Sequence, residues 1–327
     1  MGLKTEIIKK LKQETDSVSG QALCDAFGVS RTALWKCINT LKEEGYQIEA
    51  TGNKGYRIVE EPDVLTESAI GSLMQTKKMG NVVCAYEQID STNTEAKRLA
   101  EQGAVEGTLV TANYQTAGKG RRGRVWENPV GSTISMSVIL RPDIEPVKAS
   151  MLTLVMALSV SKAIENVSGL ETQIKWPNDI IIHKKKVCGI LTEMSAEMNR
   201  IHYVIIGCGI NTGNMSVSPE VKDKATSLLL EGKSVKRAVL VADVLSCFEQ
   251  EYERFLQAGN LAPLLEEYNS RLINIGKEVK ILDPLQEYQA VAEGINESGE
   301  LIVTKEDGTK EAVFSGEVSV RGIYGYV

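Results

Sequence analysis

The chain has 327 residues, of which 43% are apolar and 24% are charged. At about 150 residues per domain this length predicts two or three domains, and the composition excludes collagen-like, low-complexity and wholly disordered chains. The six cysteines form no C-x-x-C pair and there are only two histidines. We therefore expect neither a metal site built from protein side chains nor a histidine-based catalytic triad.

The net charge of −6 is unevenly distributed along the chain. Residues 1–60 carry a net +1, residues 61–271 carry −2 and residues 272–327 carry −5. A DNA contact near the N-terminus therefore remains possible despite the acidic total. The longest uncharged apolar stretch, residues 149–161, is too short to span a bilayer. With no signal-peptide core at its start, the chain is expected to be cytoplasmic and to make no membrane contact.

The first 63 residues predict a winged helix-turn-helix domain. Apolar residues recur at helical spacing in three segments, and two alternating segments separated by a Gly-Asn-Lys-Gly turn predict a β-hairpin. Ser30 is a suitable N-cap for the third helix, and Gly45 ends it. In chain order the predicted helices and strands are 3–11, 20–27, 31–44, 46–49 and 56–58.

The third predicted helix has the composition of a DNA-recognition helix. If Leu34, Ile38 and Leu41 face the core, helical geometry exposes a face with cations, amides and no acid. Such a face can contact base edges while a lysine in the wing contacts phosphate. The alternative is a protein-interaction module with an ordinary solvated face. The residues expected to contact DNA are Ser30, Arg31, Thr32, Trp35, Lys36, Asn39 and Lys54.

Residues 60–63 predict a linker, and the rest of the chain divides into two further segments. Strand and helix patterns mix in residues 64–271, as in an α+β enzyme core. Residues 272–327 contain only short strands separated by turns, which predicts a small barrel. The fold class is therefore multidomain α+β, with domains at 1–63, 64–271 and 272–327. The predicted strands are 82–86, 108–114, 133–140, 180–182, 204–207, 278–282, 288–295, 301–304, 311–314 and 317–323, and the predicted long helices are 149–166 and 238–257.

The segment from Gly118 to Arg124 is the most unusual in the chain. It contains three glycines and four cations and no acid. Glycines allow the backbone to approach a ligand, and clustered cations stabilise phosphate or carboxylate oxygens. Its G-x-G-x-x-G pattern leads into a strand, so a dinucleotide-binding turn is excluded, and it does not match a Walker loop. The alternative is a flexible basic loop that binds nucleic acid or nothing.

Two later segments carry polar residues at strand ends. Lys175-Trp176-Pro177-Asn178-Asp179 precedes a strand, and Lys186 begins the next apolar strand, from which it could point into a cleft. Gly207-Cys208-Gly209-Ile210-Asn211 ends another strand. Taken alone, this last segment is equally consistent with a tight turn.

These segments together resemble the biotin protein ligases. The motifs are Ser91-Thr92-Asn93, Gln115 with the 118–126 loop, Lys175–Asp179, Lys186-x-x-Gly189-Ile190-Leu191 and Gly207-x-Gly209-x-Asn211. They occur in the family's order, and the winged helix makes the chain similar to the bifunctional bacterial branch, the BirA family. This branch combines biotin ligation with repression of the biotin operon.

The resemblance implies a role for each matching residue. The expected catalytic residues are Arg121, Arg124 and Lys186, with Asp179 as a base on position alone. The biotin-binding residues would be Ser91, Thr92, Asn93, Gln115, Gly118, Lys119, Gly120, Arg121, Lys186 and Gly189. The nucleotide-binding residues would be Arg122, Arg124, Trp126, Lys175, Asn178, Gly207, Gly209, Asn211 and Arg321, the last in an SH3-like β-barrel.

The resemblance also implies substrates and partners. Biotin and ATP, with Mg²⁺ on the phosphates, would form biotinyl-AMP, and a lysine of the biotin carboxyl carrier protein would accept the biotin. Biotinyl-AMP would favour a homodimer that binds operator DNA. Two departures stand out: Lys119 replaces the usual first arginine of the loop, and residues 212–228 contain no aromatic side chain to cover the adenine. The rival functions are a ligand-sensing transcription regulator without catalysis and a lipoate-type ligase.

Overall fold

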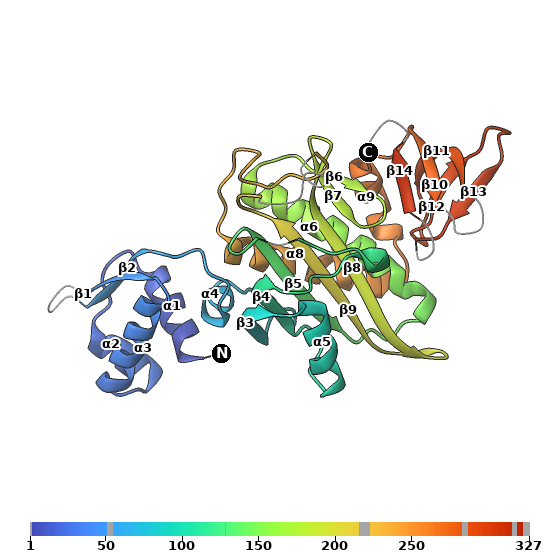
Figure 1. Cartoon of the computed structure of the whole chain (residues 1–327). Coiled ribbons are helices and arrows are strands. Elements are labelled where there is room, and N and C mark those ends of the chain that lie inside the picture. Colours follow the sequence, from blue (N-terminus) through green and yellow to red (C-terminus); the bar gives the residue numbers. More distant parts are fainter. Residues whose placement is uncertain are drawn as a thin grey trace.

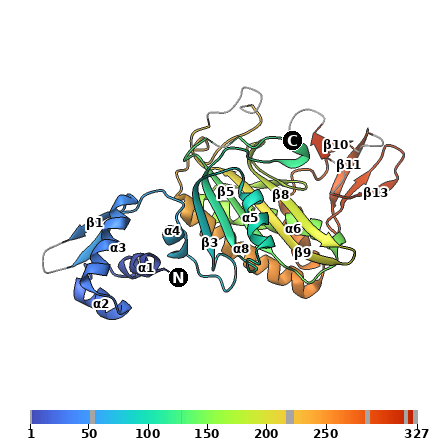
Figure 2. The same cartoon turned by 60° about the horizontal axis from the view of Figure 1, so that its bottom comes forward.

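In the computed structural model, residues 2–50, 55–127, 129–215, 223–282 and 287–315 are described, together with the backbone of residues 319–322. Lys54, the predicted wing lysine, lies outside these ranges. The molecule has three parts in a row: the N-terminal module and the C-terminal sheet lie at opposite ends of a central sheet (Figures 1 and 2). The multidomain α+β prediction is confirmed at this level.

The N-terminal module has the three helices and the hairpin that the sequence predicts. Helices α1 (Leu3–Gln13), α2 (Gly20–Phe27) and α3 (Arg31–Glu43) precede the antiparallel strands β1 (Gln47–Ala50) and β2 (Tyr56–Glu60). The Ser30 hydroxyl accepts a hydrogen bond from the Ala33 N–H at 3.2 Å, which satisfies one of the free donors at the start of α3. The module has an apolar core of its own, formed by residues of all three helices and the hairpin.

The central sheet has seven strands in the order β3-β4-β5-β9-β8-β7-β6. Strands β3 and β4 are parallel because helix α5 (Thr92–Glu101) connects them, and every other neighbouring pair is antiparallel. The sequence did not predict α5, β6 or the short helix α4 (Glu67–Gly71) that precedes the sheet. The strands are β3 (Val83–Ile89), β4 (Leu109–Gln115), β5 (Thr133–Leu140), β6 (Gln173–Lys175), β7 (Asp179–Ile182), β8 (Lys185–Glu197) and β9 (Arg200–Asn211).

Helices cover the two faces of this sheet unequally. The long helices α6 (Met151–Ser168) and α8 (Arg237–Ala258) pack side by side on one face (Figure 2), where they bury the main apolar core. On the other face α5 covers only one end of the sheet, through Ala96 and Ala100. The opposite end of that face is free to form a site.

The segment Pro146–Ser168 contains α6 and is long and apolar enough to cross a membrane by length and composition alone. However, 72% of its most apolar window is buried inside the protein. The helix packs against α8 and against strands of the central sheet. We therefore assign α6 to the protein core.

The C-terminal part is an antiparallel sheet in the order β13-β12-β11-β10-β14. Among the described residues the two edge strands, β13 and β14, do not pair, so the predicted barrel closure is not seen there. Apolar residues of this sheet belong to the same core as the central domain. The strands are β10 (Glu278–Leu282), β11 (Glu287–Ile295), β12 (Leu301–Thr304), β13 (Lys310–Val313) and β14 (Ser319–Gly322).

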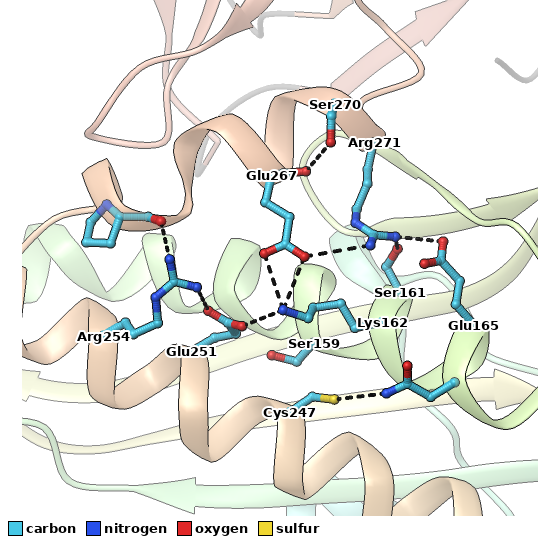
Figure 3. Close-up of polar contacts among 12 residues, drawn as sticks. Ser159, Ser161, Lys162, Glu165, Cys247, Glu251, Arg254, Glu267, Ser270 and Arg271 are labelled. Carbon is cyan, nitrogen blue, oxygen red and sulfur yellow. Dashed lines mark hydrogen bonds and ion pairs between the residues drawn. The ribbon is translucent and has the colours of Figure 1, made fainter.

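A polar cluster joins α6 and α8 to α9 (Leu265–Arg271), the helix that leads into the C-terminal sheet (Figure 3). Lys162 Nζ lies 2.8 Å from Glu251 Oε1 and 3.1 Å from Glu267 Oε1. Arg271 lies 2.6 Å from Glu165 Oε1, and Arg254 lies 2.7 Å from Glu251 Oε2. Three cations and three carboxylates thus fix the relative positions of the three helices.

A second polar contact joins the linker to the central domain. Arg237, at the start of α8, is only 4% exposed. Its backbone N–H and Nε donate to the two carboxylate oxygens of Asp63 at 2.7 and 2.9 Å. The guanidinium also donates to Asn113 Oδ1 on β4 and to the Thr133 carbonyl on β5. The linker is therefore anchored to the central sheet.

Candidate functional site

Glycines on β8 and β9 form the floor of the site. Side chains alternate across a strand, so Ile206, Cys208 and Ile210 of β9 enter the main core while Gly207 and Gly209 face the other way. A Cβ at Gly207 would lie 2.1 Å from Asn93 Oδ1, and a Cβ at Gly209 would lie 2.3 Å from Trp126 Cε2. Only glycine therefore permits these side chains to rest on the sheet.

The N-terminus of α5 and the end of β4 form a polar wall beside this floor. Ser91, Thr92, Asn93 and Gln115 are all less than 8% exposed. Gln115 Oε1 accepts from the Thr92 N–H at 2.8 Å and from the Thr92 hydroxyl at 3.1 Å. Gln115 Nε2 donates to Ser135 Oγ at 3.2 Å. The wall thus presents neutral donors and acceptors whose orientations are fixed by neighbouring groups.

The basic loop folds across the site. The Trp126 N–H donates to the Gly118 carbonyl at 2.9 Å, and Gly120 donates to the Arg124 carbonyl at 2.7 Å, so the loop closes on itself. The indole of Trp126 lies against Gly189 and Gly209. Its Nε1–H is buried and has no hydrogen-bond partner among the described residues. A buried donor without a partner is available to a bound molecule.

Arg121 is the cation of this loop that is held most firmly. It donates to Asn178 Oδ1 at 3.0 Å and to the Ser315 carbonyl of the C-terminal part at 2.8 Å. Burial lowers the pKa of Arg121, and the neighbouring Asp179 carboxylate opposes this effect. Asn178 in turn donates to the Ile190 carbonyl at 3.0 Å. Arg121 therefore connects three segments that are far apart in the sequence.

Lys186 and Asp179 form an ion pair beside the same cavity. Lys186 Nζ lies 2.6 Å from Asp179 Oδ1 and 5.5 Å from the centre of the Trp126 ring. The prediction that Lys186 points into a cleft is confirmed, because Lys186 lines the cavity formed by the wall, the floor and the loop. Asp179 contacts Lys186 and does not itself line the cavity, so it lies behind Lys186 as seen from the cavity.

This first cavity has a volume of about 50 Å³. It brings together most of the residues predicted to bind biotin or nucleotide. The predicted site residues that line it are Ser91, Thr92, Asn93, Gln115, Lys119, Gly120, Arg121, Trp126, Asn178, Lys186, Gly189, Gly207 and Gly209.

The other predicted residues are not among those that line this cavity. Arg122 and Arg124 are exposed, and Gly118 lies behind Trp126. Lys175 is 5% exposed at the end of β6, and Asn211 donates to the Thr226 carbonyl at 3.0 Å. Arg321 lies on β14, where only the backbone is described.

A larger second cavity, of about 350 Å³, adjoins the first at Arg121 and Ile190. Its other walls come from the 3₁₀ turn Pro146–Ser150 before α6, from β8 and from the C-terminal part, through Val147, Thr192 and Phe314 among others. The sequence did not predict this cavity, because its walls come from segments that lie far apart along the chain. It provides room beside Arg121 that the first cavity lacks.

Three polar residues of the site were missed by the sequence analysis. Ser135 and Ser137 lie on β5 and are at most 1% exposed, and Glu193 lies on β8. Serines that alternate with apolar residues in a buried strand signal a polar surface on one side of it. The pattern Ser135-Met136-Ser137-Val138 carried that signal. Nothing local in the sequence indicates that Glu193 reaches the residues of α5.

The predicted DNA-contacting face of α3 is exposed as expected. Ser30, Arg31, Thr32, Trp35 and Lys36 are exposed, and Asn39 is half-buried. Trp35 is 58% exposed, which is high for so large an apolar side chain. Leu34, Ile38 and Leu41 are buried, so the predicted helix orientation is confirmed. Lys54 lies outside the described residues.

Three family profiles match the chain in sequence order. An HTH domain profile matches residues 4–57, that of the Biotin/lipoate A/B protein ligase family matches residues 85–211, and that of the Biotin protein ligase C terminal domain matches residues 275–321. They correspond to the N-terminal module, most of the central sheet and the C-terminal sheet.

Curated relatives and solved structures agree with these matches. The chain is 41% identical to the bifunctional ligase/repressor BirA of Bacillus spizizenii, over 97% of this chain and 98% of that protein. It is 30% identical to BirA of Escherichia coli, over 93% and 92%. A biotin protein ligase from Aquifex aeolicus in complex with biotin and ATP is 31% identical, with a TM-score of 0.65 over 74% of this chain and 99% of that one. The chain therefore belongs to the BirA family of bifunctional biotin protein ligases and repressors.

Proposed function

We propose that the first cavity binds biotin against the wall of α5 and β4, and that the basic loop holds the carboxylate and the α-phosphate of ATP. The single observation that carries this proposal is that the neutral polar wall and the cations Arg121 and Lys186 meet in one cavity. A ureido ring needs neutral donors and acceptors, and a carboxylate beside a phosphate needs cations. The indole of Trp126 covers Gly189 and Gly209 of the floor, so biotin reaches the floor as Trp126 and its loop move outward.

The first reaction is the activation of biotin. A carboxylate is a poor acyl donor, and attack of its oxygen on the α-phosphorus of ATP, supplied as the Mg²⁺ complex, gives biotinyl-AMP and releases pyrophosphate. Arg121, Arg124 and Lys186 stabilise the negative charge that develops on the phosphates. Removal of one such preorganised group costs about 10²-fold in rate. Lys119, which contacts Thr94 Oγ1 at 2.9 Å, supplies charge without the bidentate geometry of arginine.

The nucleotide lies on the side of the cavity that Asn178 lines, with Lys175, Asn211 and Arg321 of β14 as its further contacts. Trp126 covers the adenine, since residues 212–228 contain no aromatic residue; residues 216–222 of that segment lie outside the described part of the chain.

The second reaction is the transfer of biotin to its acceptor. The second cavity gives the acceptor lysine of a biotin carboxyl carrier protein a path to the activated carboxyl carbon. The lysine amine attacks that carbon and AMP leaves. Asp179, paired with Lys186, is the nearest candidate for the base.

The N-terminal module serves operator recognition. The exposed face of α3 contacts base edges through Arg31, Lys36 and Asn39, while Thr32, Trp35 and the N-cap Ser30 complete the contact surface and Lys54 contacts phosphate. Biotinyl-AMP orders the loop and favours a homodimer, and two linked recognition helices bind paired half-sites far more tightly than one. Equal operator affinity with and without biotin and ATP would rule out this linkage.

The same proposal includes three further points. The chain is organised into domains 1–63, 64–271 and 272–327, and the protein is cytoplasmic. The C-terminal sheet closes into an SH3-like barrel. Five short antiparallel strands and the bulge near Gly294 on β11 support the barrel, because bulges bend strands toward closure. An experimental structure in which β13 and β14 remain apart would rule it out.

Incubation with ATP, a carrier domain and either biotin or lipoate tests the ligase proposal. We expect labelled carrier only with biotin. Label with lipoate would support the lipoate-type ligase, and no label with either substrate would support a transcription regulator without catalysis. The matched control is the carrier domain whose acceptor lysine is replaced by arginine, which keeps the charge but must remain unlabelled.

A further inference from the structure

A chain of hydrogen bonds runs from the surface of the sheet to the polar wall of the first cavity. Glu193 Oε2 accepts from Asn93 Nδ2 at 2.7 Å. Asn93 Oδ1 lies 2.6 Å from Ser137 Oγ, which lies 2.8 Å from Thr92 Oγ1. Thr92 also contacts Gln115 of the wall. We call these four residues, Glu193, Asn93, Ser137 and Thr92, the relay.

The number of protons that each side chain can donate determines which atom is the donor in each hydrogen bond of the relay. An ionised carboxylate only accepts, so Glu193 holds the amide of Asn93 with its NH₂ toward Glu193 and its oxygen toward Ser137. Burial raises the pKa of Glu193, but hydrogen bonds from Lys97 and Asn93 outweigh this effect, and the pKa lies below the usual value for glutamate. The carboxylate is therefore ionised at neutral pH.

Ser137 has one hydroxyl proton, and the Asn93 oxygen can only accept it. Thr92 directs its own proton to Gln115 Oε1 at 3.1 Å, and the single proton of Ser137 goes to Asn93 Oδ1, the closer of its two acceptors. The lone pairs of Thr92 Oγ1 remain free to accept from a molecule in the cavity. If the Asn93 amide were reversed, its NH₂ would donate to Ser137, and Ser137 would donate to Thr92.

We propose that Glu193 is a positioning residue for biotin, and that it acts through Asn93 and Ser137 to make Thr92 a hydrogen-bond acceptor for a ureido N–H. This inference rests on the proposed biotin site. Asn93 itself is then part of the supporting structure: its amide is occupied by Glu193 and Ser137 and it rests on Gly207. Glu193 touches neither substrate, and its effect belongs to the binding of biotin rather than of ATP.

Lys97 provides the matched control, because it contacts the other carboxylate oxygen, Glu193 Oε1, at 2.6 Å. Lys97→Ala removes this ion pair and leaves the acceptor for Asn93 in place. Glu193→Ala removes both acceptors. Glu193→Gln keeps one carbonyl oxygen for two donors, and the charged Lys97 takes it, so the new NH₂ faces Asn93 and no longer fixes its amide. The variants therefore separate the hydrogen bond to Asn93 from the ion pair with Lys97.

The experiment is biotin-dependent exchange of pyrophosphate into ATP by the full chain. We expect Glu193→Ala to raise the KM for biotin about tenfold, the size of one buried hydrogen bond, while kcat and the KM for ATP stay within about twofold. Glu193→Gln should also raise the KM for biotin, whereas Lys97→Ala should behave like the wild-type protein. An unchanged KM for biotin in Glu193→Ala, or an equal rise in Lys97→Ala, overturns the proposal.

Ser137→Ala tests the relay independently if Glu193→Ala folds poorly. It should raise the KM for biotin by a similar factor, and the double variant should lose little more than either single variant, because both changes break one chain. Losses that multiply would contradict a relay. A wild-type protein without biotin-dependent exchange would instead refute the proposed biotin site, so the two failures are distinguishable.

Discussion

The floor of the site depends on the absence of side chains at two positions of one strand. A Cβ at Gly209 would lie within 2.6 Å of three atoms of the Trp126 indole. We predict that Gly209→Ala displaces this ring, since overpacking a filled site costs about 1–3 kcal/mol. The expected result is a change in tryptophan fluorescence and weaker binding of biotin and ATP, measured by fluorescence titration and by KM.

The control for this prediction is Gly20→Ala at the start of α2. The added Cβ would meet Tyr56 Cε2 at 3.4 Å, an ordinary contact distance. It should leave the kinetics unchanged, because it adds a methyl group far from the site without a clash. Normal KM values for both substrates in Gly209→Ala would show that the indole does not rest on the floor as described.

The polar cluster of Figure 3, in which Glu251 is the buried member, determines how three helices pack. The Glu251 side chain is 3% exposed and depends on Lys162 and Arg254 for neutralisation. We predict that Lys162→Met destabilises the protein by about 3 kcal/mol, because it removes one partner of a buried charge. The double variant Lys162→Met with Glu251→Met should recover most of this loss. Urea unfolding measures both, and a double variant no more stable than the single one would contradict the argument.

The same cluster gives the stability a definite dependence on pH. Burial raises the pKa of Glu165, but hydrogen bonds from Arg271 and Thr172 outweigh this, and the pKa lies below its usual value of 4.5. A carboxyl group with a lowered pKa contributes stability above its unfolded-state pKa and loses it as the pH falls through the folded value. We predict that the free energy of unfolding falls below about pH 4.5, and falls less steeply in Glu165→Gln than in the wild-type protein. Urea unfolding at a series of pH values measures both slopes, and equal slopes would contradict the assignment to Glu165.

The elements that were predicted from sequence are those with a strong apolar pattern. Strand β5 and strand β10 have the predicted bounds, and helices α6 and α8 differ from the prediction by two residues at most. Helix α5 was missed because it buries only alanines and polar side chains, which leave no apolar stripe. Strand β6 is only three residues long, too short for an alternating pattern to be recognised.

The same distinction applies to the site: its local motifs could be predicted from the sequence, and its contacts between distant residues could not. The motifs identified the loop, Lys186 and the strand glycines, because each motif carries its chemistry within a few consecutive residues. The contacts of Asn93 with Glu193 and of Arg121 with Ser315 could not be predicted, since the residues are 100 and 194 positions apart. Such contacts depend on sheet order and register, which apolar patterns do not specify.

At the scale of the whole molecule, the N-terminal module is held to the central domain by a few specific contacts. Lys12 pairs with Glu61 at 2.8 Å, Ser68 donates to Glu44 at 3.2 Å, and Arg237 binds Asp63. The Arg237 side chain is 5% exposed and also reaches the Thr133 carbonyl. Thr133 pairs with Asn211 at the end of β9, beside the proposed nucleotide site.

Through Arg237, Asp63 therefore connects the linker to the strand ends that border the proposed nucleotide site. We predict that Asp63→Ala leaves the rate of biotin transfer unchanged. It should reduce the ratio of the operator affinity measured with biotin and ATP to the affinity measured without them. The physical reason is that Arg237 would keep its contacts with the sheet and with the backbone carbonyl of residue 63 but lose both bonds to the Asp63 carboxylate, which weakens its hold on the linker. Filter binding at fixed salt measures the ratio, because affinity for DNA depends strongly on salt. Lys10→Ala, which removes only an exposed ion pair within α1 and its cap, is the control and should keep the wild-type ratio. A ratio unaffected by Asp63→Ala would mean that the linker contact holds the module in place without transmitting the state of the site.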